Sequence, residues 1–205
     1  MKARSTEYVI FDVETTGLSP RDGDRILELA ALKVKNFEVV DSFESFINPQ
    51  RDIPEQAQRI HQITPEMVKG APVAAEVLPR FVDFIGGACL CGQNVKFDLD
   101  FVCHELAEAG YKLRENTPAI DTIKMAKYFM PHLGSYRLAN IAQAFGVRID
   151  VTHRAGADVE LTNQIFRHLL ILAEEQHFIT FQEVLKEFGV DQPIYRLKQN
   201  QDMLF

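Results

Sequence analysis

Two carboxylates, Asp12 and Glu14, stand at the end of an apolar run in segment 8–17, YVIFDVETTG. Side chains on a strand alternate between its faces, so both acids would project from the same face. Apolar residues on both faces predict a strand over 8–14 near the middle of a sheet. Two like charges are unfavourable there unless a cation neutralises them, and their oxygen ligands suit Mg²⁺ or Mn²⁺. A strand that stops at residue 11, with both acids in a solvated turn, explains this stretch equally well.

Two further acids, Asp98 and Asp158, each begin the apolar face of a predicted helix. Apolar residues follow Asp98 in segment 96–110, and Asp158 in segment 155–175, at helical spacing. Each acid therefore points inward, where it needs a partner. His153 precedes Asp158 by five residues in VTHRAGAD. A lone histidine is more often a surface or core residue, but the inward acid beside His153 favours a functional role.

The elements that must position these residues have a mixed α/β pattern. Strands at 8–14, 25–34 and 37–48, with Lys35 and Asn36 as a turn, predict an antiparallel meander. Short strands are expected at 88–94 and 118–122. The expected helices, several opening on proline or ending on glycine, lie at 54–60, 64–70, 73–86, 96–110, 123–130, 136–146, 155–175 and 180–189. Strands that later alternate with helices predict a mixed sheet with helices on its faces.

Composition limits the class of protein. The chain has 205 residues, of which 46% are hydrophobic and 25% charged, as in one ordinary globular domain. There is no apolar run long enough to span a membrane and no signal-peptide core before the first strand. Three cysteines, Cys89, Cys91 and Cys103, predict reduced, buried thiols and a cytoplasmic protein. The net charge of −7 opposes a bulk electrostatic footprint on nucleic acid, although bound metal ions can reverse the local sign.

Three segments, FDVETTGL, GQNVKFDLDFV and HRAGAD, resemble the ordered motifs D-x-E-T-T-G, N-x-x-F-D and H-x-x-x-x-D of the DEDDh 3′–5′ exonucleases. The likeness is greatest to the proofreading epsilon subunits of bacterial DNA polymerase III, and it spans about residues 7–175. IHQIT at 60–64 resembles a further family element, I-H-G-I-T, with Gln62 at the usual glycine. The resemblance implies a ribonuclease-H-like fold, an antiparallel meander plus parallel strands flanked by helices.

The resemblance also implies a reaction and its residues. A metal-dependent enzyme would hydrolyse phosphodiester bonds from DNA 3′ ends and release nucleoside 5′-monophosphates, in proofreading or repair. His153 matches the general base. The acids that match ligands of two divalent ions, Mg²⁺ or Mn²⁺, are Asp12, Glu14, Asp98 and Asp158. An RNA exonuclease of the oligoribonuclease or RNase T type, and a non-catalytic clamp- or polymerase-binding module, are the alternatives.

Further residues are expected to contact the substrate, a single-stranded or frayed 3′ end. Thr15, Gly17 and Leu18 belong to the TTGL segment, where Gly17 would let the backbone approach and Leu18 would wedge against a base. His61 is implied to contact the scissile phosphate or the terminal sugar. The alternative for His61 is an ordinary histidine at a helix end.

The end of the chain is predicted to be separate from the nuclease. We expect an exonuclease domain over 1–175, followed by a helix and a flexible tail over 176–205. The final QDMLF resembles the Q-x-x-L-F peptide with which bacterial replication proteins bind the sliding clamp. The residues implied to bind are Gln201, Met203, Leu204 and Phe205. In the alternative, the apolar residues fold back onto the domain. A DNA polymerase catalytic subunit is a second expected partner, and a membrane is not expected.

Overall fold

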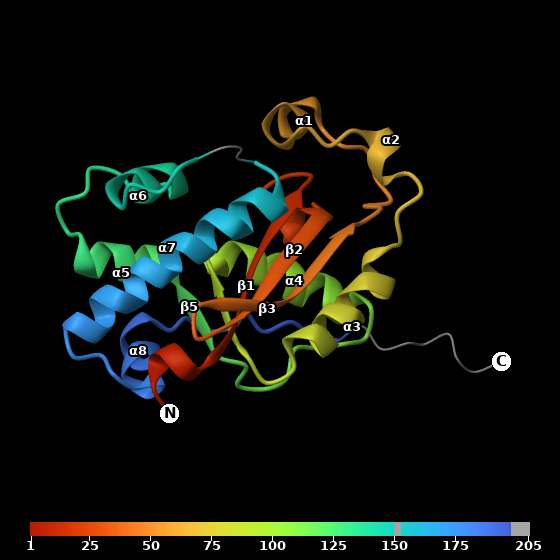
Figure 1. Ribbon diagram of the computed structural model, residues 1–205. Coiled ribbons are helices and arrows are strands. Elements are labelled where there is room, and N and C mark those ends of the chain that lie inside the picture. Colours follow the sequence, from red (N-terminus) through yellow and green to blue (C-terminus); the bar gives the residue numbers. More distant parts are fainter. Residues whose placement is uncertain (150–152, 198–205) are drawn as a thin grey trace.

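A computed structural model of the chain describes residues 1–149 and 153–197 (Figure 1). Its centre is a five-stranded sheet with the order β3-β2-β1-β4-β5. The strands are β1 (Glu7–Thr15), β2 (Ile26–Lys35), β3 (Glu38–Phe46), β4 (Cys89–Gly92) and β5 (Ala119–Asp121). The meander β1–β2–β3 is antiparallel, whereas β4 and β5 join β1 in parallel. The mixed sheet predicted from the sequence is therefore confirmed.

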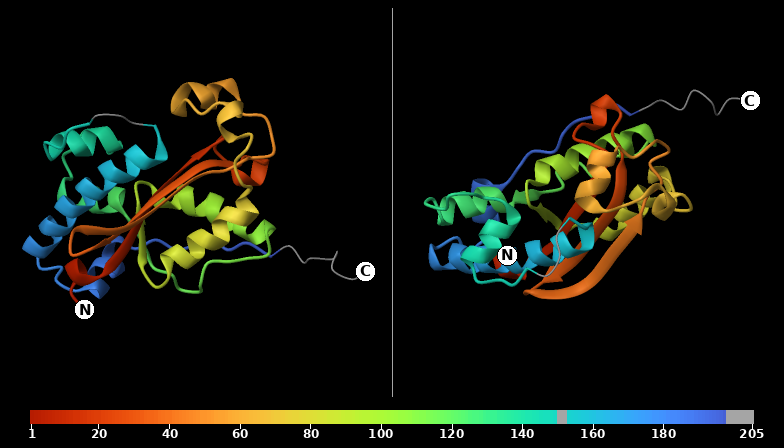
Figure 2. Two further views of the ribbon diagram at one scale, coloured as in Figure 1. Left: turned by 45° about the vertical axis from the view of Figure 1, so that its right-hand side comes forward. Right: turned by 90° about the horizontal axis from the view of Figure 1, so that it is seen from above.

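Helices cover both faces of the sheet (Figure 2). They are α1 (Glu55–His61), α2 (Pro65–Val68), α3 (Ala74–Ile85), α4 (Val95–Glu108), α5 (Thr122–Phe129), α6 (Leu138–Ala144), α7 (Ala155–Glu175) and α8 (Phe181–Phe188). Helices α3 and α4 lie on one face, and α7 lies on the other together with α5, α6 and α8. The short helices α1 and α2 stand beyond the end of the meander (Figure 1).

The alternation of side chains along β1 explains why this strand is central. Tyr8 and Ile10 are buried against the α7 side, and Val9, Phe11 and Val13 are buried against α3 and α4. Burying apolar side chains on both faces stabilises the strand only between two layers of helices. The strand does not stop at residue 11, since it continues to Thr15 and carries both acids within the sheet.

The turn between β2 and β3 lies one residue later than predicted. Asn36 and Phe37 connect the strands with φ of 52° and 67°, so Lys35 is the last residue of β2. Two consecutive positive φ values suit a tight hairpin, because they match the twist of the strands. Phenylalanine is an uncommon residue in that conformation, and the sequence therefore gave no sign of it.

The chain after α8 has no helix or strand over residues 190–197, but its first part makes hydrogen bonds near the edge of the sheet. The backbone N–H of Val190 donates to the Ala119 carbonyl at 2.9 Å, and the side-chain amide of Gln192 donates to the Thr117 carbonyl. Residues 189–197 thus lie against β5 and α4, and we call this segment the C-terminal strap. The predicted clamp-binding residues, Gln201, Met203, Leu204 and Phe205, lie outside the described residues.

Two smaller expectations can be compared with the fold. Cys89, Cys91 and Cys103 are free and buried, which confirms their role as small core residues. Within residues 1–149 and 153–197, no helix is long and apolar enough to cross a membrane.

Candidate active site

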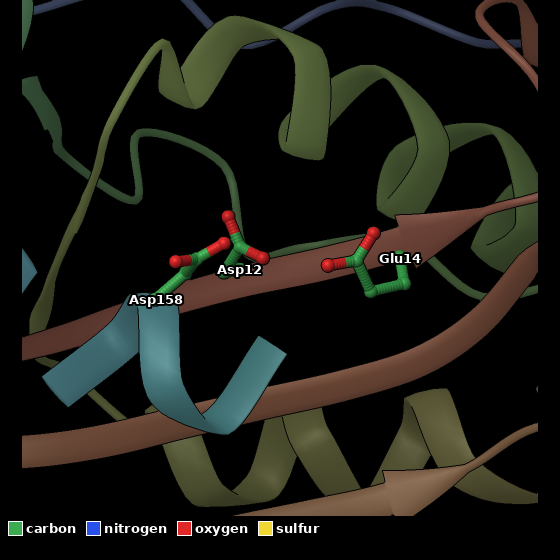
Figure 3. A group of neighbouring side chains, drawn as sticks. All are labelled: Asp12, Glu14 and Asp158. Atoms are coloured by element: carbon green, nitrogen blue, oxygen red, sulfur yellow. The ribbon is translucent and has the colours of Figure 1, made fainter. Parts of the chain in front are cut away.

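Three acids predicted from the sequence meet at one point of the fold. Asp12 and Glu14 project from β1, and Asp158 projects from the first turn of α7 (Figure 3). One carboxylate oxygen of each lies within 4.8 Å of the others. The strand places Asp12 and Glu14 on one face, as their spacing predicts, and the packing of α7 against β1 supplies Asp158.

The electrostatics of this cluster are unfavourable without a cation. Burial raises the pKa of Asp12 well above its usual range, and the nearby charges of Asp98 and Glu14 raise it further. Burial and the charge of Asp158 raise the pKa of Glu14 to about 8. The Oδ1 atom of Asp158 is buried and has no hydrogen-bond partner among the described residues. A set of oxygen donors with an unsatisfied buried atom fits a hard divalent cation.

Asp98 adjoins this cluster without belonging to the group within 4.8 Å. It lies in the first turn of α4 with only 3% of its surface exposed, so the inward direction predicted for it is confirmed. Its Oδ1 accepts a hydrogen bond from the backbone N–H of Val13 at 3.1 Å. This bond fixes the start of α4 to β1 between the two strand acids. The role of Asp98 as a metal ligand stays a prediction.

His153 lies immediately before α7 with an exposed side chain and a left-handed backbone, φ 63°. Its backbone N–H donates to Oδ2 of Asp158 at 3.0 Å. The pKa of Asp158 is raised by burial, while this hydrogen bond and the charge of His153 lower it. The imidazole is therefore beside the acidic cluster and open to solvent. The role of His153 as general base stays a prediction.

An ion pair that sequence reasoning missed, between Glu28 and Arg154, joins β2 to the segment just before α7. Glu28 lies on β2 directly opposite Glu14 and is 1% exposed. Its carboxylate accepts two hydrogen bonds from the Arg154 guanidinium, at 2.6 and 3.0 Å, and a third from the backbone N–H of Ala155 at 3.1 Å. The sequence carries a signal for Glu28, which is the one charged residue in the apolar run ILELAAL at 26–32.

The TTGL segment forms a tight loop that is stabilised by hydrogen bonds to the carboxylate of Asp24. The Asp24 carboxylate accepts hydrogen bonds from the Thr16 hydroxyl at 3.2 Å and from the backbone N–H of Ser19 at 3.1 Å. A side chain on Gly17 would collide with this carboxylate and displace Asp24 from its hydrogen bonds in the loop. The Thr15 hydroxyl donates to the Gly17 carbonyl at 2.6 Å, and Leu18 is 85% exposed beyond it. Contact of this loop with substrate stays a prediction.

His61 is not an ordinary surface histidine, because it is 2% exposed at the end of α1. Its Nδ1 accepts a hydrogen bond from the Ile63 N–H at 3.0 Å, and its buried Nε2 has no partner in the described chain. Burial lowers the pKa of His61, which favours a neutral ring with its proton on Nε2. Gln62 follows with φ 59°, a left-handed conformation that explains why glycine is usual at this place in the motif.

This fold and site define a class of nuclease. The sequence model of a family described as Exonuclease (RNase_T) matches residues 9–166. The chain belongs to this exonuclease family.

Particular relatives are similar over most of this chain. It is 38% identical to a DNA polymerase III PolC-type of Clostridium perfringens over 78% of its length. It is 33% identical to a 3′-5′ exonuclease DinG of Bacillus subtilis over 80% of its length. The chain spans only 11% and 17% of these two relatives.

A solved structure shows the same fold. The structure of E. coli Exonuclease I in complex with a dT13 oligonucleotide has a TM-score of 0.73. The alignment covers 83% of this chain and 42% of that one, at 21% identity. At this identity the likeness establishes the ribonuclease-H-like architecture alone.

Proposed function

We propose that this protein is a metal-dependent exonuclease that removes nucleotides from the 3′ end of single-stranded or frayed DNA. The observation that carries the proposal is the convergence of Asp12, Glu14 and Asp158 within 4.8 Å, beside Asp98 and His153. The products would be nucleoside 5′-monophosphates, released in proofreading or repair.

Each residue has a distinct role in the proposed reaction. Asp12, Glu14, Asp98 and Asp158 hold two divalent ions, Mg²⁺ or Mn²⁺. When bound, such ions activate water and stabilise the departing 3′-oxygen. His153 accepts the proton of the attacking water at its imidazole nitrogen, as a general base does. His61 donates its Nε2 proton to the terminal nucleotide, and Leu18 packs against a base.

DNA is the proposed substrate because a similar relative is a DNA polymerase III. A DNA polymerase catalytic subunit is the corresponding proposed partner, and a cytoplasmic location remains a prediction. The RNA-degrading alternative would keep the same mechanism. The non-catalytic alternative is disfavoured, because a module that had lost its reaction has no need to retain an unstable cluster of buried acids.

A degradation assay tests this function directly. Matched single-stranded DNA and RNA oligonucleotides with a 5′ label would be incubated with Mg²⁺ or Mn²⁺, with His153→Ala as the control. We expect a ladder that shortens from the 3′ end of DNA and is absent in the variant. Faster degradation of RNA than of DNA would indicate that RNA is the substrate. No ladder on either substrate, with the fold intact, would contradict the proposal.

We also propose that the final QDMLF binds a sliding clamp and tethers the nuclease to replicating DNA. The support is the sequence alone, since Gln201, Met203, Leu204 and Phe205 lie outside the described residues. Short peptides of this kind bind at about micromolar strength. Deleting residues 201–205 should abolish clamp binding in surface plasmon resonance and leave activity on short oligonucleotides intact. Unchanged clamp binding would refute the idea.

A further inference from the structure

The C-terminal strap, residues 189–197, joins parts of the fold that lie far apart in the sequence. It leaves α8 through Gly189, which forms an antiparallel bridge with Ile120 of β5. It then runs beside α4 toward the loop between β1 and β2 (Figure 2). That loop contains the 3₁₀ turn η2 (Pro20–Asp22) and carries Leu18. The strap therefore reaches the part of the molecule in which substrate contacts are proposed.

Tyr195 makes the contacts at the far end of the strap. Its hydroxyl donates to Oδ1 of Asp100 on α4 at 2.6 Å and accepts from Nε of Arg21 in η2 at 3.2 Å. The Arg21 guanidinium also lies over the Tyr195 ring, 5.3 Å from its centre. The ring of His104 on α4 packs edge-on against it, with centroids 5.0 Å apart. One hydroxyl thus links the substrate loop to the helix that carries Asp98.

Arg21 and Asp100, which the Tyr195 hydroxyl joins, both line a surface groove. The strap, the loop and the first turn of α4 together line a groove, to which Pro193, Leu18 and Phe97 contribute. Phe97 directly precedes Asp98, and Leu18 is the most exposed apolar side chain of its loop at 85%. Because Arg21 is only three residues from Leu18, movement of η2 relative to α4 would carry Leu18 with it.

We propose that Tyr195 is a positioning residue for the nucleic-acid strand. It holds the loop that carries Leu18 at a fixed place relative to α4, so that a base resting on Leu18 is in register with Asp98. This inference rests on the proposed exonuclease function and extends it to a segment beyond the matched family region, residues 9–166. Tyr195 lies outside the acidic cluster, and it would act through Arg21 and Asp100.

Steady-state kinetics with a double-mutant cycle test the proposal. Release of the first nucleotide from a labelled single-stranded oligonucleotide would be measured for wild type, Tyr195→Phe, Leu18→Ala and the double variant. Tyr195→Phe removes only the hydroxyl, so we expect KM to rise about fivefold with kcat within about twofold. In the Leu18→Ala background the same change should raise KM by less than about twofold, because positioned side chains couple. Tyr111→Phe is the matched control, since the described structure shows no hydrogen bond for its hydroxyl.

Hydrogen exchange provides a second readout, because loss of the link should speed exchange of the amides at 16–24. An unchanged KM in Tyr195→Phe would overturn the proposal even if the melting temperature falls, because the hydroxyl would then be merely structural. A full KM effect that persists in the Leu18→Ala background would overturn it as well. An inactive wild-type enzyme would instead refute the exonuclease function on which the proposal rests.

Discussion

The guanidinium of Arg154 donates two hydrogen bonds to the carboxylate of Glu28, although the residues are 126 positions apart in the sequence. Glu28 lies on the rigid meander opposite Glu14, whereas Arg154 lies between His153 and the start of α7. The pair therefore fixes the segment that carries the candidate base and Asp158 to the strands. It also places a positive charge near the acids, which lowers the pKa of Glu14 against the effect of burial.

Arg154→Lys should impair catalysis more than folding. Lysine keeps the charge but cannot form the two-pronged contact with Glu28, so the segment that holds His153 and Asp158 loses its fixed geometry. We expect kcat to fall about tenfold or more, because small misplacements of reacting groups are costly. Arg167→Lys, at an exposed position of α7, is the control. Equal kcat values for the two variants would contradict the bracing role.

His153→Ala should lose about a hundredfold or more in rate while it retains substrate binding, because the general base is removed and the acids remain. Single-turnover rates and fluorescence anisotropy with a labelled oligonucleotide would separate the two effects. His132→Ala, an exposed histidine outside the site, should behave as wild type. Near-normal turnover in His153→Ala would show that His153 is not the general base.

Asp12→Ala should weaken metal binding as well as the reaction. Asp12 belongs to the group of oxygens within 4.8 Å, and its pKa is raised by burial and by the charges of four neighbouring carboxylates. Isothermal titration with Mn²⁺ should show affinity reduced about a hundredfold or more, in line with loss of a ligand. Asp41→Ala, on the exposed strand β3, should bind as wild type. Unaltered Mn²⁺ affinity in Asp12→Ala would show that Asp12 is not a metal ligand.

The metal-free protein should become less stable as pH rises from about 4.5 to about 8. The pKa of Glu14 is 4.5 in its ordinary state and about 8 in the fold, so the native state retains a proton that the unfolded chain releases. The free energy of unfolding therefore falls across this window. A divalent ion binds the deprotonated acids, so Mg²⁺ should raise the melting temperature more near pH 8 than near pH 5. An equal rise at both pH values, in thermal unfolding with and without chelator, would contradict this account.

Gln62→Gly should stabilise the protein. Gln62 has φ 59°, in which a side chain is unfavourable by about 1 kcal/mol, and its only side-chain hydrogen bond here is an exposed one to the Arg59 carbonyl. After the greater freedom of glycine in the unfolded chain is subtracted, a gain of about 0.5 kcal/mol in the free energy of unfolding remains. Gln58→Gly, one turn earlier in α1, should instead destabilise. Urea denaturation measures both, and a loss of stability in Gln62→Gly would show that the hydrogen bond dominates.

The sequence was sufficient for the features that depend on periodicity. The alternation around Phe11 predicts a strand buried on both faces, and the apolar stripe after Asp158 predicts its inward position. The candidate acids follow from these patterns, and the structure brings Asp12, Glu14 and Asp158 together. The inward direction of Asp98 also follows, although its bond to the Val13 N–H does not.

The features that could not be predicted depend on pairing between distant segments. Arg154 has no periodic relation to Glu28, and Tyr195 has none to Arg21 or Asp100. The close approach of Asp24 to Gly17 arises only after the loop has closed. Local patterns report which side of an element is buried, whereas they carry no information about which polar groups meet after folding.

The origin of the site residues along the chain has a consequence for synthesis. Asp12 on β1 is made before Asp98 on α4, and Asp98 is made before Asp158 on α7. A nascent chain that ends before α7 therefore has no complete set of acids, however well its meander has folded. Pairing over such separations is slow because long loops must close first. Nuclease activity should thus emerge on the ribosome only after α7 has been made, so that a partly folded chain does not cut nucleic acid.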